Sequence, residues 1–273
     1  MASAVELPYE LKQDIFELTA YAHPDVAPRL ALVSHQVQQW VEAVIYETIV
    51  LGPKSRKQDL FWRTFSSRPP EFFAKRIRSL HASTGAPPAQ VFSLFSVCQN
   101  LATFTWWDRQ AKFDTHLALI ASSSNLRRLS VDALTVVGST VLNFRHPLFK
   151  HLTHLEIVNP PIGYDWTSLL EEGALPDLTH LAFGDLYAAH AYQEPSIVPF
   201  LEAALASEEP MLKVLILVSR DEELQAALEE DGITDDKRVV CLPSYHHPLN
   251  PAEYWEGVAR REVQFWETDR VRR

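Results

Sequence analysis

The stretch Asn125-Leu126-Arg127-Arg128-Leu129-Ser130-Val131 decides the fold, together with its counterpart His151-Leu152-Thr153-His154-Leu155-Glu156-Ile157. Both stretches carry apolar residues at positions i, i+3 and i+5. The same triplet occurs six times in the chain of 273 residues, starting at residues 77, 101, 126, 152, 178 and 212. The steps between these starts are 24, 25, 26, 26 and 34 residues. A period in this range predicts a solenoid, in which each unit packs mainly on its neighbours.

The pattern Leu-x-x-Leu-x-Leu in these units resembles the leucine-rich repeat. The Asn or Cys that usually follows in the consensus is not evident, so the repeats look degenerate. The resemblance implies an α/β fold with a parallel sheet, curved like a horseshoe, and with helices on its outer side. Helix-like stretches between the triplets agree with this arrangement; they are Ala89–Gln99, Asp114–Ser123, Val141–Lys150, Pro195–Ala206 and Asp221–Glu229.

Strand alternation predicts which residues share a face of the sheet. If Leu129 and Val131 point into the core, then Arg128, Ser130 and Asp132 point to the concave face. The same offset in the other units gives columns along that face, and one of these columns runs through Ser79, Thr103, Arg128, His154, His180 and Val214. We expect this face to hold a protein target. The candidate target-binding residues are His81, Thr105, Trp107, Arg128, Ser130, Asp132, His154, Glu156 and His180. The alternative is that these are merely solvated positions on an open sheet.

The last triplet differs, because Val214, Ile216 and Val218 would face the concave side although they are apolar. We expect the C-terminal part of the chain to cover them. Val239–Leu242 is predicted to form one more strand. An aromatic helix is predicted to dock beside it, since four large rings recur at helical spacing; these are Tyr254, Trp255, Phe265 and Trp266. This region is interpreted as a structural cap rather than as a ligand site.

A separate helical segment precedes the repeats. Pro8 suits the first turn of a helix, and Leu11, Ile15 and Leu18 follow at helical spacing. The stretch His23-Pro24-Asp25 ends that helix, and Asp25 is a candidate N-cap for the next one. A further apolar stripe runs from Leu30 to Val44, and residues 46–51 become β-like. A segment of this size cannot bury so many apolar side chains by itself.

This segment resembles the F-box, in the version found in a large group of fungal F-box-like proteins. The resemblance rests on Leu7-Pro8, Leu11, Ile15, the stretch Arg29–Ser34, and Trp40 with the residues that follow it to Leu51. It implies binding to Skp1, and through Skp1 to a cullin, in a ubiquitin ligase. The residues at motif positions that usually face Skp1 are Leu7, Pro8, Leu11, Ile15, Leu30, Val33 and Ser34. The alternative is that residues 6–51 only cap the solenoid.

The sequence thus predicts two domains, an F-box-like module over residues 1–51 and degenerate repeats with a C-terminal cap over residues 52–273. The expected function is that of a substrate-recognition adaptor of a Skp1–cullin–F-box ubiquitin ligase. The alternative is a leucine-rich-repeat scaffold with no role in ubiquitin transfer. We expect no cofactor and no metal. We also expect no enzymatic activity, because no phosphate loop or nucleophile motif is found.

The composition of the chain limits which partners and which cellular compartment we expect. The net charge of −10 argues against nucleic acid as the main partner, although basic residues gather between residues 54 and 78. Cys98 and Cys241 lie in apolar runs and are predicted to be buried thiols in a reducing compartment. No signal peptide or long apolar segment is visible, so we expect no membrane partner and a cytoplasmic or nuclear location.

Overall fold

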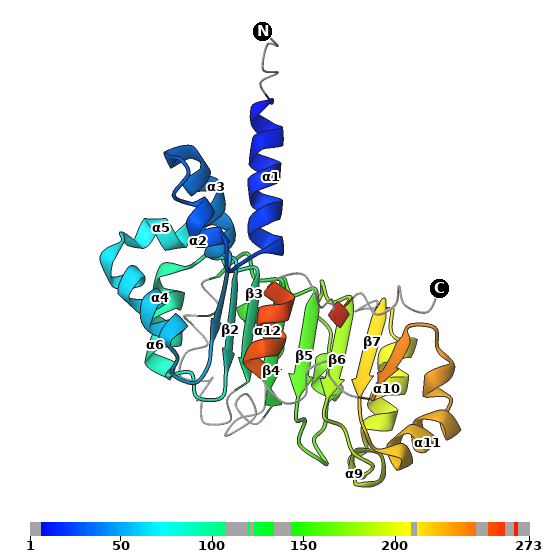
Figure 1. The fold of residues 1–273 in the computed structure, drawn as a ribbon. Helices are drawn as coiled ribbons and strands as arrows, with labels where there is room; N and C mark the ends of the chain where they lie inside the picture. The colour runs from blue at the N-terminus through cyan, green and yellow to red at the C-terminus, as the bar shows by residue number, and fades with distance from the viewer. Residues whose placement is uncertain are drawn as a thin grey trace.

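The computed structural model describes residues 7–107, 120, 123–133, 143–208, 212–243, 251–259 and 265–266. Its centre is one sheet of eight parallel strands, and the spatial order of the strands equals their order in the sequence (Figure 1). The strands are β1 Thr48–Leu51, β2 Ser79–Ser83, β3 Thr103–Trp107, β4 Arg128–Asp132, β5 His154–Val158, β6 His180–Gly184, β7 Val214–Val218 and β8 Val239–Leu242. The predicted α/β class with a parallel sheet is therefore confirmed.

The register of the sheet follows the spacing of the triplets. Thr103 pairs with Arg128, Arg128 with His154, and His154 with His180. The column that passes through His81, Thr105, Ser130 and Glu156 is also in register. Each strand begins two residues after the first apolar residue of its triplet, which explains why a constant spacing in sequence produces an unslipped sheet.

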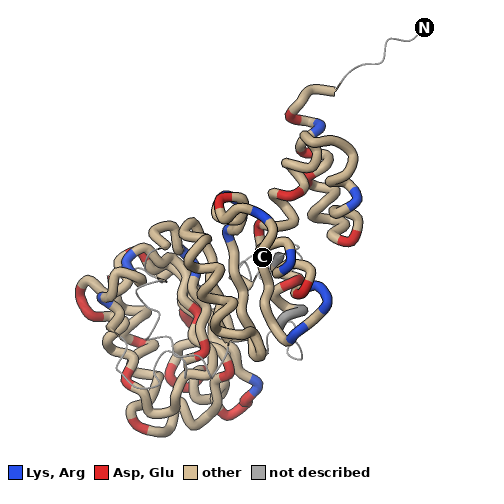
Figure 2. Tube along the Cα trace, turned by 90° about the vertical axis from the view of Figure 1, so that its left-hand side faces the viewer, with Lys and Arg blue, Asp and Glu red and all other residues tan. Residues whose placement is uncertain are grey.

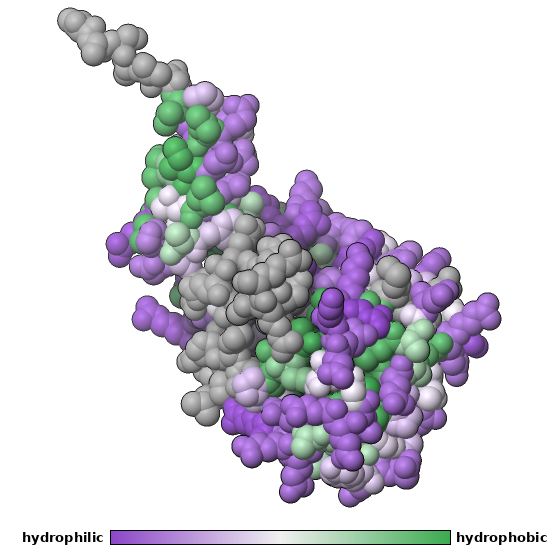
Figure 3. Space-filling view, turned by 90° about the vertical axis from the view of Figure 1, so that its right-hand side faces the viewer, coloured by the Kyte–Doolittle hydropathy of each residue, from purple (hydrophilic) through white to green (hydrophobic). Residues whose placement is uncertain are grey.

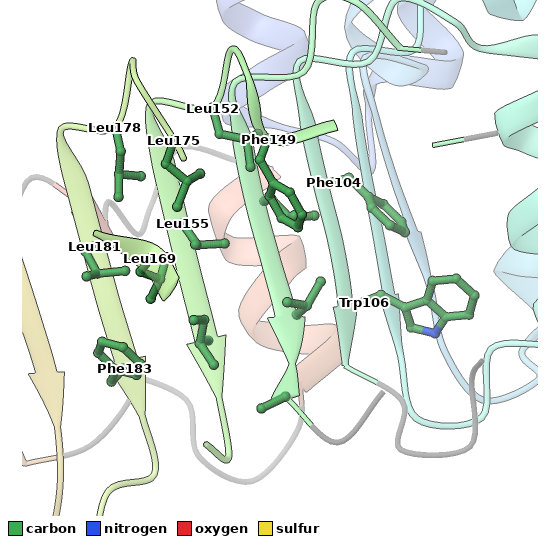
Figure 4. Packing of buried hydrophobic residues seen from close by; sticks show 14 of the residues in the cluster. Phe104, Trp106, Phe149, Leu152, Leu155, Leu169, Leu175, Leu178, Leu181 and Phe183 are labelled. Carbon is green, nitrogen blue, oxygen red and sulfur yellow. The ribbon is translucent and has the colours of Figure 1, made fainter. Parts of the chain in front are cut away.

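One face of the sheet carries the main hydrophobic core. Phe104, Trp106, Leu155 and Phe183 point to this side, and α12 (Pro251–Ala259) lies on the opposite side of the strands (Figure 4). The connections between strands close over the core. They contain α6 Pro88–Val97, α9 Ala189–Tyr192, α10 Ile197–Ala206, α11 Glu222–Glu230 and the short 3-10 turns η2 Pro147–Phe149, η3 Thr167–Leu169 and η4 Ile233–Asp235.

Three of the predicted helices, α6, α10 and α11, occur where they were expected. Asp221 caps α11, since its carboxylate accepts hydrogen bonds from the N–H groups of Glu223 and Leu224. The predicted helix Asp114–Ser123 lies almost wholly outside the described residues. Of the predicted helix Val141–Lys150, the described part contains only the short turn η2. Pro147 suits its first turn, because proline has no backbone N–H to donate to a preceding carbonyl.

The N-terminal part forms a small helical module of α1 Tyr9–Ala22, α2 Ala27–Leu30 and α3 His35–Ile45, which stands away from the repeats (Figure 2). Its own core consists of Ala20, Ala27, Val37, Trp40 and Val41. The prediction that Asp25 caps the second helix is wrong, because the N-cap is Val26.

Strand β1 also lies differently from the prediction. It pairs with β2 and so belongs to the sheet, although the sequence placed it in the module. Its branched side chains Ile49 and Leu51 are buried in the repeat core, which is why the strand joins that layer. Two helices then lead back to β2, namely α4 Arg56–Ser67 and α5 Pro70–Ala74. The helical module therefore ends at Ile45.

Candidate functional site

The helical module presents a set of large apolar side chains to solvent. Leu18 is 65% exposed and Leu32 is 85% exposed, and their neighbours on the same module are about half exposed. Figure 3 shows a hydrophobic patch over the module. The set, called here the module face, consists of Leu7, Leu11, Ile15, Leu18, Leu32 and Val33. Such a concentration of exposed apolar groups marks an interaction surface.

The module face is exposed because the small core of the module is made by other residues. Trp40 packs edge-on against Tyr9 with 5.1 Å between ring centroids, and its indole N–H donates to the Tyr9 hydroxyl at 3.2 Å. Phe16 also packs against Trp40 from the inner side of α1. Residues 11, 15 and 18 fall on the other side of the same helix. One face of α1 thus packs in the core of the module, and the opposite face of α1 is exposed to solvent.

Most of the residues that the F-box resemblance selected lie on or beside the module face. Leu7, Pro8, Leu11, Ile15, Val33 and Ser34 are all exposed. Leu30 is half-buried and packs against the core of the module. Ser34 caps α3, since its hydroxyl accepts from the N–H of Val37 at 3.2 Å. The selection missed Leu18 and Leu32, although helical spacing places Leu18 beside Ile15.

Polar contacts join the module to the first part of the repeats. The Tyr21 hydroxyl donates to the Glu47 carboxylate, just before β1. Arg68, which follows α4, donates to Glu42 at 2.9 Å. Glu42 is buried, so this ion pair is less screened by water than a surface pair. These contacts orient the module and leave the module face unused.

A second candidate site lies on the face of the sheet opposite the main core. Here α12 and the turn at Phe265 and Trp266 cover the strands, and they are called the C-terminal segment below (Figure 1). Tyr254, Trp255 and Phe265 share one buried cluster with residues of the sheet, namely Val158, Ala182, Val214, Ile216, Val218 and Val240. The predicted cover over the last triplet is confirmed, and β8 is the predicted extra strand. The helix α12 is described to Ala259, and Phe265 and Trp266 lie in a 3-10 turn. The part of the predicted aromatic helix between them lies outside the described residues.

The C-terminal segment also changes the role of the predicted target-binding face. Five of the predicted target-binding residues are buried within the protein and do not form an open surface; they are His81, Thr105, Ser130, Asp132 and Glu156. Trp107, His154 and His180 are half-buried, and Arg128 is exposed. The expectation of an open concave face is therefore corrected. The physical reason is the aromatic packing of Trp255 on His81 and of Trp266 on His154 and His180.

Four polar side chains on this face form two hydrogen-bonded pairs. The ring nitrogen Nδ1 of His81 lies 2.9 Å from the Thr105 hydroxyl, and the Trp107 indole N–H donates to the Ser130 hydroxyl at 2.7 Å. Burial lowers the pKa of His81 to about 3, so its imidazole is neutral. Burial also raises the pKa of the Tyr254 hydroxyl, and the nearby Glu156 charge adds to that effect. This end of the face is a packed polar layer.

His154 and His180 stack in parallel, with 4.0 Å between ring centroids, as their neighbouring positions predicted. Burial lowers the pKa of His154 to about 3, with smaller contributions from His180 and from the charge of Arg128. Among the described residues, no group of three or more His, Cys, Asp or Glu could hold a metal ion. His154 and His180 form a stacked aromatic contact, and Trp266 packs edge-on against both rings.

A cavity of about 280 Å³ remains between the sheet and the C-terminal segment. Its mouth is lined by the first residues of neighbouring strands, Ser79, Thr103 and Arg128, and its floor includes the buried Glu156. Its roof includes Val258 and the aromatic rings Tyr254, Trp255, Phe265 and Trp266. The cavity thus combines a polar floor with an apolar roof.

Comparison with known proteins adds no family to this description: no family model matches the chain, and no curated protein matches it. No helix in the described part of the chain is long and apolar enough to cross a membrane.

Proposed function

We propose that this protein is a substrate-recognition adaptor of a Skp1–cullin–F-box ubiquitin ligase. In this proposal the helical module is an F-box that binds Skp1 through the module face. The repeats are a degenerate leucine-rich-repeat solenoid that holds a protein target. The F-box resemblance of the sequence names this partner, and the geometry of the module supports the proposal.

The observation that carries the proposal is the exposure of the module face. Burial of apolar surface contributes about 25 cal/mol per Å². Leu18 and Leu32 forgo that gain in the free protein, since they are 65% and 85% exposed. A partner that covered them would recover it. A cap that only protected the end of the solenoid would instead direct these side chains at the repeats.

The target surface lies outside the covered part of the sheet in this proposal. Exposed apolar side chains occur on the connections that follow β5 and β6, at Ile162, Tyr187 and Tyr192. Tyrosines are enriched at the energetic centres of protein interfaces. We therefore place target contacts at these connections, rather than at the buried residues His81, Thr105, Ser130 and Glu156.

An adaptor of this kind needs no catalytic residue of its own. It raises the effective concentration of the target near a ubiquitin-charged enzyme that the cullin holds. The function depends on two binding surfaces and on a constant distance between them. The ion pair of Arg68 with the buried Glu42 contributes to that constancy, because it ties the module to the repeats.

Co-expression with fungal Skp1, followed by size-exclusion chromatography, tests the proposal. We expect a one-to-one complex. The double substitution Leu11→Asp and Ile15→Asp should abolish it without unfolding the repeats, because both side chains are exposed. A matched control is Leu60→Asp, since Leu60 is an equally exposed leucine on α4, outside the module. A parent protein that stays monomeric with Skp1, or a double variant that still binds it, would reject the proposal.

The second candidate function is a repeat scaffold whose N-terminal module is only a cap. The specific observation in its favour is the set of polar contacts at Glu42 and Glu47, which tie the module to the repeats. Deletion of residues 1–45, which retains β1 and Tyr46 with its packing on the main core, separates the two functions. Unfolding of the remaining repeats would favour the cap, whereas a cooperative unfolding transition near that of the parent would favour an independent module.

A further inference from the structure

The cavity beneath the C-terminal segment has an unusual polar row at its mouth. Ser79, Thr103 and Arg128 are the first residues of β2, β3 and β4, and they stand in register. Adjacent strands lie about 4.8 Å apart, so each side chain neighbours the next. Two hydroxyls and one guanidinium therefore point from the same face into one small space.

These three side chains are not used by the fold. Within the part of the chain that the structure describes, none of them forms a side-chain hydrogen bond or an ion pair, and all three are at least partly exposed. The deeper floor differs, because the hydroxyls of Thr105 and Ser130 bond to His81 and Trp107. The available donors are thus concentrated at the mouth of the cavity.

The charges around the cavity restrict which anion can bind. Arg128 contributes one positive charge, and a guanidinium binds a planar carboxylate through two parallel hydrogen bonds. Glu156 lies in the floor and Glu47 at the β1 end of the lining, where it already accepts from Tyr21. One guanidinium and two carboxylates leave the lining with a net negative charge, which disfavours a doubly charged phosphate more than a singly charged carboxylate. A single negative charge held by Arg128 and the two hydroxyls is the better match.

The roof and the volume select the rest of the ligand. Val258 and Trp266 close the cavity from above with apolar surface. A volume of about 280 Å³ is just below the ~300–1,000 Å³ found for ligand pockets. It suits a molecule with one ring or one fused pair of rings, and it is too small for a nucleotide or a peptide of several residues.

We propose that this cavity binds a small organic carboxylate, with its carboxylate on Arg128, Thr103 and Ser79 and its apolar body beneath Val258 and Trp266. Such a ligand would contact the sheet and the C-terminal segment at once. It would therefore stabilise the docked position of that segment, because it binds only when both parts are in place. The proposal concerns the repeats and does not rest on binding to Skp1.

Ligand-observed NMR and calorimetry on the full-length protein test this site. The probes are three carboxylates, benzoate, cyclohexanecarboxylate and indole-3-carboxylate, each paired with its neutral primary amide. We expect at least one acid to bind at least tenfold more tightly than its amide, because only the acid carries the charge that Arg128 recognises. Phenyl phosphate is included as the doubly charged alternative.

Three variants locate the binding. Arg128→Gln should weaken the acid tenfold or more, since hydrogen bonds to charged groups are the strong ones. Thr103→Val, which preserves shape, should weaken it severalfold. The matched control is Arg127→Gln, because the Arg127 guanidinium bonds to the carbonyls of Ser124 and Leu126 and does not line the cavity. Arg127→Gln should leave the affinity unchanged.

Several results would overturn the proposal. One is that no acid binds at 10 mM or that acid and amide bind alike. Another is that phenyl phosphate binds more tightly than every carboxylate. A third is that Arg127→Gln and Arg128→Gln have equal effects, which would indicate only a general attraction of anions. Circular dichroism checks whether each variant is folded. If Arg128→Gln does not fold, the affinity of Thr103→Val for the acid decides whether the proposal stands.

Discussion

The imidazole of His81 lies face to face with the indole of Trp255, with 4.3 Å between the ring centroids and 10° between the ring planes. This contact joins β2 to α12, which are far apart in the sequence. Trp107 packs edge-on against the same indole at 5.0 Å. The C-terminal segment is thus held on the sheet mainly by aromatic packing.

Trp255→Ala should therefore release much of the stability of this layer. Trp255 is buried, and truncation of a buried tryptophan costs about 3–5 kcal/mol. We expect urea unfolding to shift by about 3 kcal/mol or, if α12 undocks first, proteases to cut near residue 259 while the sheet remains folded. Tyr187→Ala, at an exposed aromatic residue, is the control and should change the free energy of unfolding by less than about 0.5 kcal/mol. Equal effects of the two variants would contradict this account.

Charge contributes much less to the same attachment. Lys57 on α4 pairs with Glu256 on α12 at 2.9 Å, with the two side chains 79% and 35% exposed. Exposed ion pairs contribute about 0–1 kcal/mol, because water screens them and both side chains lose freedom. We expect Lys57→Ala to lower the free energy of unfolding by less than about 0.5 kcal/mol in urea. If Lys57→Ala lowered the free energy of unfolding nearly as much as Trp255→Ala, the ion pair of Lys57 and Glu256 would contribute more to stability than its exposure predicts.

His81 should make the stability of the protein depend on pH. Its pKa falls from 6.5 to about 3 on folding because the ring is buried, so the unfolded chain binds the extra proton. The contribution is fully present above pH 6.5 and is lost progressively as the pH falls toward 3. Between pH 7 and pH 5.5 this single group should lower the free energy of unfolding by about 1 kcal/mol.

Denaturant unfolding at several pH values checks this prediction. His81→Gln removes the titrating ring and should flatten the dependence by about 1 kcal/mol over that interval. Thr105→Val serves as the control, because it removes the hydrogen bond to His81 and keeps the imidazole. It should lower the stability and preserve the slope. Part of the slope should remain in His81→Gln, because burial also lowers the pKa of His154 to about 3. A slope that is unchanged in His81→Gln would contradict the role given to His81.

The two roles of Ser34 can be separated experimentally. Its hydroxyl caps α3, and loss of such a cap costs about 1 kcal/mol. Ser34→Ala should therefore increase hydrogen exchange in the first turn of α3, whereas Ser34→Asp should retain the cap. If Ser34 also contacts Skp1, as the F-box resemblance implies, both variants should weaken the complex. Weaker binding by Ser34→Ala alone would indicate that only the cap matters.

The sequence was most informative about positions within the sheet. Alternation along each strand and the near-constant spacing of the triplets correctly placed His154 beside His180 and Arg128 beside Thr103. What covers a face is a different question, because alternation says which residues share a face and nothing about the layer above it. The apolar Val214, Ile216 and Val218 did reveal a cover at one end. The polar His81, Thr105 and Glu156 gave no such signal, so their burial under an aromatic segment was missed.

Removal of residues 244–273 should convert the covered face into an exposed apolar surface. Ala182, Ile216 and Val218 are almost fully buried and belong to one cluster with Tyr254 and Trp255. Without the C-terminal segment they would form a contiguous patch of the kind that drives association. We expect the truncated protein to bind a hydrophobic dye and to aggregate in light scattering. The further substitution of Ile216 and Val218 by Thr should reduce that aggregation, because it keeps the branched shape that suits a strand and lowers the apolar area. A truncated protein that stays monomeric without these substitutions would mean that the segment is not needed to cover the sheet.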